Sequence, residues 1–149
     1  MSLKVTVLVV SDGLIGMLLR KFLGVVFIVS GEAKMWDIYG FSRVVSGYRF
    51  LPESLIVPVS IIVPFAEFVF GLMLLLNLNP RVASLSLLMM VVMFSILSAV
   101  RYFSGDISDC GCFGKLIHRS VDWKFFTENI MLIGGLVVII IKTTNNHKQ

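Results

Sequence analysis

Long apolar runs separated by short polar stretches dominate this chain. Each run approaches or exceeds the roughly 20 apolar residues that a helix needs to cross about 30 Å of hydrocarbon. The runs cover residues 15–34, 52–76, 80–103 and 125–142. This pattern predicts an all-α membrane protein, a bundle of four transmembrane helices in one domain over residues 1–149.

Prolines and glycines mark the ends of these expected helices. Pro52 and Pro80 stand in first-turn positions where a helix needs no backbone donor, and Gly105 ends the third run. The second run also contains Pro58 and Pro64, which remove backbone hydrogen bonds. We therefore expect the second helix to be kinked.

Composition agrees with a membrane environment. Of 149 residues, 57% are hydrophobic and 15% are charged, and the mean hydropathy is +0.94. So little polar surface cannot cover a soluble globule of this size. The net charge of +4 does not indicate nucleic-acid binding, because the basic residues are scattered among the helix ends. No signal-peptide cleavage site follows the first run, so we expect that helix to remain as an anchor.

Two longer connections, residues 35–51 and 104–124, should lie on one side of the membrane, with both termini on the other. All Trp and Tyr residues fall on the first side: Trp36, Tyr39, Tyr48, Tyr102 and Trp123. This asymmetry fits either an amphipathic cap over the cysteines or an ordinary interfacial aromatic belt. Lys and Arg are divided almost equally between the sides and only marginally favour a cytoplasmic location for the two connections.

The two cysteines lie one glycine apart, in Cys110-Gly111-Cys112 within the connection 104–124. A turn at Gly111 brings such thiols into disulfide range. The pair can exchange disulfides, bind a soft metal such as copper or mercury, or simply pack, and exchange is the favoured interpretation. With a single pair, the chain would either reduce a quinone directly or trade electrons with a thioredoxin-like partner.

Charged residues inside the apolar runs form a second candidate site. Counting 1.5 Å per residue places Arg20 and Glu67 about 21 and 22 Å from the cysteine side, on neighbouring helices. We therefore expect an intramembrane ion pair between them, or else an Arg20 that reaches the far interface and a protonated Glu67. Glu32 and Glu128 lie nearer the cysteines and are candidate acceptors for a thiol proton.

Several short motifs follow one another along the chain, each occurring once: Gly24-x-x-Phe27-x-x-x-Gly31-x-x-Lys34, Gly40-Phe41, Tyr48-Arg49-Phe50-Leu51-Pro52, Pro64-Phe65-x-Glu67-x-x-x-Gly71 and Asp109-Cys110-Gly111-Cys112-Phe113-Gly114. In this order the chain resembles the methylamine-utilisation MauE family, within the DoxX-like, redox-associated membrane proteins. The resemblance implies a four-span protein of the bacterial inner membrane whose cysteine connection is periplasmic. It also implies a role beside a thioredoxin-like protein in maturing the disulfide-rich small subunit of methylamine dehydrogenase.

The resemblance matches Cys110 and Cys112 to the family's cysteine motif, and Lys34 and Glu67 to its charged positions. Together with the residue patterns, it predicts a membrane-embedded thiol–disulfide redox protein, with a cysteine-rich or thioredoxin-like partner and with a quinone as the one cofactor considered. Two alternatives stay open: a copper or mercury binding or transport protein that uses the same cysteines, and an assembly factor without chemistry of its own.

Overall fold

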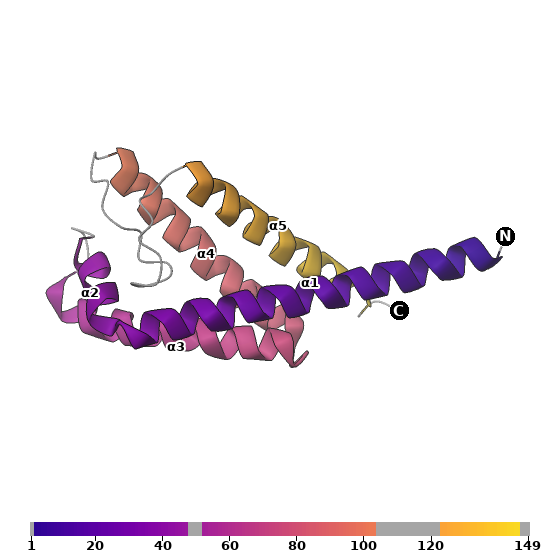
Figure 1. The fold of residues 1–149 in the computed structure, drawn as a ribbon, viewed down its shortest axis with the longest axis horizontal. Helices are drawn as coiled ribbons and strands as arrows, with labels where there is room; N and C mark the ends of the chain where they lie inside the picture. Colours follow the sequence, from indigo (N-terminus) through magenta and orange to yellow (C-terminus); the bar gives the residue numbers. More distant parts are fainter. Residues whose placement is uncertain (1, 48–51, 104–122, 147–149) are drawn as a thin grey trace.

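The computed structural model describes residues 2–47, 52–103 and 123–146, which form five α-helices and no strand. The cysteines, Cys110 and Cys112, lie outside the described residues. The helices, drawn in Figure 1, are α1 (Ser2–Trp36), α2 (Ile38–Ser46), α3 (Glu53–Leu75), α4 (Pro80–Phe103) and α5 (Trp123–Asn146).

Four of these helices are long and apolar enough to cross a membrane. Their spanning segments are Leu14–Trp36, Glu53–Leu75, Pro80–Val100 and Thr127–Thr144. The predicted all-α fold with four spans is therefore confirmed, and the chain is an integral membrane protein. The first helix differs in length from the prediction, because it begins at Ser2 rather than near residue 15. No proline interrupts the residues before Leu14, so the helix continues through them.

The four long helices form a closed ring in which α1 contacts α3, α3 contacts α4, α4 contacts α5, and α5 contacts α1. Buried apolar side chains from all four fill the ring: Leu23, Phe27, Leu74, Ala83, Leu87, Val91, Leu136 and Ile139. Large apolar side chains such as Phe22, Phe65 and Met131 are exposed on the outside. An apolar exterior of this kind suits contact with lipid.

The bundle has two distinct ends (Figure 1). At one end lie α2, the start of α3, the end of α4 and the start of α5; we call this the connection end. At the other, the terminal end, lie both termini and the turn between α3 and α4. Asn77 and Asn79 adopt left-handed backbone conformations in that turn, with φ of 62° and 46°, which Asn tolerates better than most residues.

Helix α2 is a short amphipathic helix within the first long connection, and the sequence did not predict it as a separate helix. Asp37 caps its start by accepting a hydrogen bond from the Gly40 amide at 3.0 Å. Phe41 and Val45 are buried, while Tyr39 is 83% exposed. An amphipathic element thus exists at the connection end, and its predicted position over the cysteines stays a prediction.

Helix α3 is continuous from Glu53 to Leu75 although Pro58 and Pro64 lie inside it. Each proline removes one backbone donor and leaves the carbonyl four residues earlier without its usual partner. Pro64 is fully buried, and it lies where α3 meets α1. The proline-bearing part of α3 is therefore part of a helix–helix contact.

Candidate functional site

Glycines set the register between α1 and α3. A Cβ atom on Gly31 would lie 2.8 Å from both the Phe68 nitrogen and the Pro64 carbonyl oxygen, and one on Gly24 would lie 2.9 Å from the Leu75 nitrogen. These distances are shorter than real Cβ contacts, so only glycine lets the two backbones approach this closely. The antiparallel helices are therefore fixed with Gly31 beside the middle of α3 and Gly24 beside its end.

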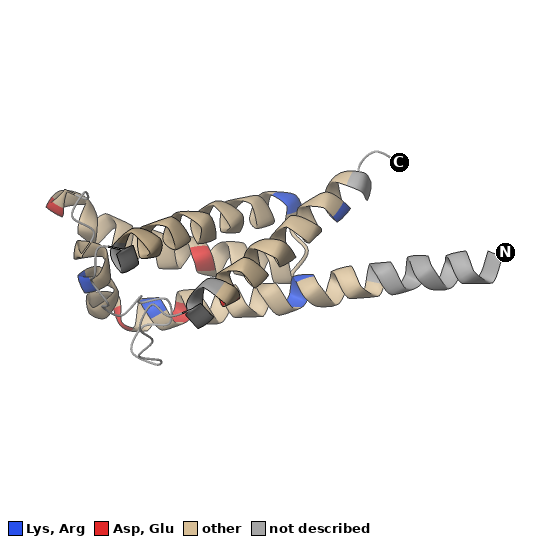
Figure 2. Cartoon of the chain, turned by 90° about the horizontal axis from the view of Figure 1, so that it is seen from above, with Lys and Arg blue, Asp and Glu red and all other residues tan. Residues whose placement is uncertain are grey.

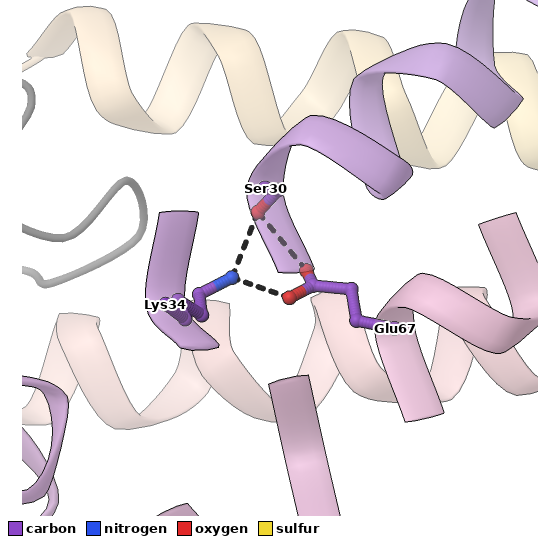
Figure 3. Close-up of polar contacts among 3 residues, drawn as sticks. All are labelled: Ser30, Lys34 and Glu67. Carbon is purple, nitrogen blue, oxygen red and sulfur yellow. Dashed lines mark hydrogen bonds and ion pairs between the residues drawn. The ribbon is translucent and has the colours of Figure 1, made fainter. Parts of the chain in front are cut away.

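This register brings together Ser30 and Lys34 of α1 and Glu67 of α3 (Figure 3). The Lys34 Nζ atom lies 2.5 Å from Glu67 Oε2 and donates a hydrogen bond to Ser30 Oγ at 2.8 Å. Ser30 Oγ in turn donates to Glu67 Oε1 at 3.3 Å. Both carboxylate oxygens and two of the three ammonium hydrogens thus have partners within one closed triangle.

The triangle is shielded from its surroundings. Lys34 is 3% exposed, and Glu67 and Ser30 are each 7% exposed. Two charges removed from water cost several kcal/mol each, a cost that is offset only where each is the counter-ion of the other and the remaining polar atoms are hydrogen-bonded. The two charges are counter-ions of each other, and both carboxylate oxygens and two ammonium hydrogens are hydrogen-bonded, so the site is a buried ion pair with most of its polar atoms partnered.

Two aromatic rings complete the enclosure of the Lys34 ammonium group. Its Nζ atom lies 6.0 Å from the ring centroid of Phe41 on α2 and 5.8 Å from that of Phe94 on α4. The two ring centroids are 6.1 Å apart. Such distances allow a cation–π attraction. The ion pair is thus the point at which α1, α2, α3 and α4 converge.

The structure gives Glu67 a different partner from the one that the sequence predicted, Lys34 in place of Arg20. The depth estimate placed the end of α1 level with the start of α3. In fact Gly31 lies beside Pro64, so the first turns of α3 extend past the end of α1. Lys34 consequently reaches the level of Glu67, and Arg20 lies near the end of α3.

The two predicted proton acceptors, Glu32 and Glu128, are not part of the buried ion pair. Glu32 is exposed on α1, and Glu128 is exposed near the start of α5. Their predicted role as proton acceptors depends on where Cys110 and Cys112 lie, so it stays a prediction. Sequence reasoning missed Ser30 and Phe94 as parts of the site; the position of Ser30, one turn before Lys34, is the signal that could have found it.

The ion pair can hold helices together and can pass a proton between its members, since carboxylate, hydroxyl and ammonium groups are in direct hydrogen-bonding contact. Ionisable residues inside membrane proteins are costly and usually serve function. In the part of the chain that the structure describes, no group of three or more His, Cys, Asp or Glu residues could hold a metal ion.

Fold and site together define a polytopic integral membrane protein whose first two spans are joined by a buried ion pair. The family described as methylamine utilisation protein MauE matches residues 12–142. The chain therefore belongs to the MauE family, as its motifs predicted.

Two MauE proteins illustrate the similarity. The methylamine utilization protein MauE of Paracoccus denitrificans is 25% identical over 115 residues, which is 76% of this chain and 62% of that protein. The protein of the same name from Paracoccus versutus is 27% identical over 125 residues, 83% of this chain and 67% of that protein. The chain thus spans about two thirds of the length of these relatives. No solved structure matches it.

Proposed function

We propose that this chain is a membrane-embedded thiol–disulfide redox protein that serves methylamine utilisation. The observation that carries the proposal is the pair Cys110 and Cys112, one glycine apart in a chain of the MauE family. The residues that contain this pair follow the end of α4 at Phe103 and precede the start of α5 at Trp123. Both of these helix ends lie at the connection end of the bundle (Figure 1).

The reaction is a dithiol–disulfide exchange. One thiolate of the pair attacks a disulfide of the partner and forms a mixed disulfide, releasing one partner thiolate. The second thiolate of the pair then displaces the remaining partner sulfur. Two electrons have passed to the partner, which ends as a dithiol, while Cys110 and Cys112 end as a disulfide. The reverse sequence oxidises the partner, and the two reduction potentials set the direction.

The partner in this proposal is a thioredoxin-like or cysteine-rich protein, as in the maturation of methylamine dehydrogenase. The membrane is the bacterial inner membrane, and the cysteines face the periplasm, a compartment in which disulfides persist. Support comes from family membership and from the single cysteine pair, which suits exchange with a second protein.

The first test is the reduction potential of the pair, measured in nanodiscs by thiol trapping against glutathione buffers. A value of about −120 to −200 mV supports a role in making disulfides, and a value near −270 mV or below supports a role as reductant. A pair that forms no disulfide at any potential would refute the proposal.

The second test traps the partner. Cys110→Ser and Cys112→Ser each leave one thiol, so the variant that retains the attacking cysteine should accumulate a mixed disulfide with the partner. The double variant is the control and should trap nothing. Stoichiometric copper(I) binding without exchange would instead favour the metal-binding alternative. Normal methylamine utilisation by cells that carry the double variant would favour the assembly factor.

A further inference from the structure

The two ends of the bundle differ in net charge, with basic residues at both ends and the coloured acidic ones away from the C-terminus (Figure 2). Among the residues that the structure describes, the terminal end carries five basic ones, Lys4, Arg20, Lys21, Arg81 and Lys142, against one acidic one, Asp12. Apart from the Lys34–Glu67 pair, the connection end carries four acidic residues, Glu32, Asp37, Glu53 and Glu128, against three basic ones, Arg43, Arg101 and Lys124. Lys34 and Glu67 cancel each other, so the described residues give the terminal end a net charge of +4 (five basic, one acidic) and the connection end −1 (three basic, four acidic).

Arg20, Arg81 and Lys142 come from three helices but share one level. Arg20 lies one turn before Gly24, which contacts the end of α3. Arg81 is the second residue of α4, directly after the turn from α3. Lys142 of α5 crosses to α1, where its Cδ atom would lie 3.4 Å from a Cβ on Gly16. Gly16 is in turn one helical turn from Arg20.

Arg20 needs an acceptor that the described chain does not provide. Its Nε atom is buried and has no hydrogen-bond partner within the part of the chain that the structure describes. A guanidinium group carries five donors and no acceptor, so another molecule or residue must supply the missing oxygen. A buried donor without a partner costs about 1–3 kcal/mol or more. Phosphate oxygens match the planar donor fork of arginine in both geometry and charge.

We propose that Arg20 binds the headgroup phosphate of an anionic phospholipid where α1 and α5 meet, with Lys21, Arg81 and Lys142 adding to the positive field. Lipid supplies this ligand because Arg81 and Lys142 lie at the ends of their spans and Arg20 is level with them, next to exposed apolar side chains such as Leu76 and Val82. A zwitterionic headgroup would bring its own cation towards four basic side chains, so the site favours a lipid with net negative charge.

The experiment titrates the purified full-length chain, in neutral detergent, with phosphatidylglycerol or phosphatidylcholine of identical acyl chains and measures bound lipid by native mass spectrometry. We expect tighter binding of phosphatidylglycerol. Arg20→Gln should weaken it about fivefold, since one basic residue near an anionic surface contributes about 1 kcal/mol. Arg43→Gln removes an equivalent charge at the connection end and is the matched control, with no expected effect.

A conservative variant separates charge from geometry. Arg20→Lys keeps the positive charge and loses the donor fork, so its affinity for phosphatidylglycerol should lie between those of the unaltered chain and Arg20→Gln. It also serves in place of Arg20→Gln if thermal unfolding without lipid shows that Arg20→Gln does not fold. Because the readout is lipid retention, failure here leaves the thiol–disulfide proposal untouched.

Three outcomes would overturn the proposal. Equal affinity for the two lipids would show that negative charge is not recognised. An equal loss in Arg43→Gln would show that only the overall charge of the protein matters. Displacement of phosphatidylglycerol by millimolar inorganic phosphate would show that the site takes free phosphate rather than a lipid headgroup.

Discussion

Replacing Glu67 by glutamine tests whether the buried ion pair stabilises the bundle. Glutamine has nearly the same shape and keeps an oxygen and an amide near Ser30, but it removes the negative charge. The Lys34 ammonium, whose side chain is only 4% exposed, would then lose its counter-ion. Breaking a buried pair in this way costs about 3–5 kcal/mol. Lys34 is two residues from the end of α1 and can relax towards the interface, so we expect the lower value, about 3 kcal/mol.

Thermal unfolding in detergent micelles measures this cost. For a chain of this size, 1 kcal/mol corresponds to about 2–4 °C in Tm, so Glu67→Gln should lower Tm by about 6–12 °C. Glu32→Gln is the matched control, because it makes the same chemical change at an exposed position of α1. An exposed substitution of this kind changes stability by no more than about 0.5 kcal/mol, or about 2 °C.

The double variant Lys34→Met/Glu67→Gln gives the sharper result. Removing the ammonium that Glu67→Gln leaves without a counter-ion should restore stability, so the double variant should unfold at a higher temperature than Glu67→Gln alone. If the stability losses of the single variants Lys34→Met and Glu67→Gln simply add in the double variant, the two charges are not coupled, and the reasoning from the 2.5 Å contact is wrong.

Two further predictions concern packing. Gly31→Ala should lower stability by about 1–3 kcal/mol, because its Cβ would meet α3 backbone atoms at 2.8 Å; Gly134→Ala, where a Cβ meets nothing within 4 Å, should leave Tm unchanged or slightly higher. Phe41→Ala removes a fully buried ring, so hydrogen exchange of α2 amides should accelerate about 100-fold, whereas Tyr39→Ala, at an exposed position, should leave it unchanged. Equal changes in Tm for Gly31→Ala and Gly134→Ala would contradict the close contact of Gly31 with α3. Equal exchange rates in Phe41→Ala and Tyr39→Ala would contradict the role of Phe41 in holding α2.

Hydropathy was enough to predict the four spans, because the cost of unpaired backbone groups in lipid leaves few alternatives to a helix of about 20 apolar residues. It could not predict the start of α1, where apolar residues continue towards Ser2 without a breaker. It also gave no separate helix at α2, whose nine residues are stabilised by Asp37 at the cap and by burial of Phe41.

The partner of Glu67 was harder to predict, because it depends on how far one helix slides along another. Depth counting assumed that the first two spans end level at the membrane surface. The actual offset is set by the close contacts of Gly24 and Gly31 with α3, which move Lys34 to the level of Glu67. The glycine spacing was visible in the sequence, but the residues that it would contact were not.

The ion pair also has a consequence for the order in which the protein is assembled. Lys34 precedes Glu67 by 33 residues, so the ribosome delivers the ammonium group before its carboxylate exists. During that interval a lone cation at the end of α1 is more stable near the headgroups than inside the bundle. When α3 arrives, Glu67 supplies the counter-ion, and the free-energy cost of burying the Lys34 ammonium is offset. Burial of Lys34 is therefore coupled to insertion of the second span, and a chain that stops before Glu67 cannot complete the contact between its first helices.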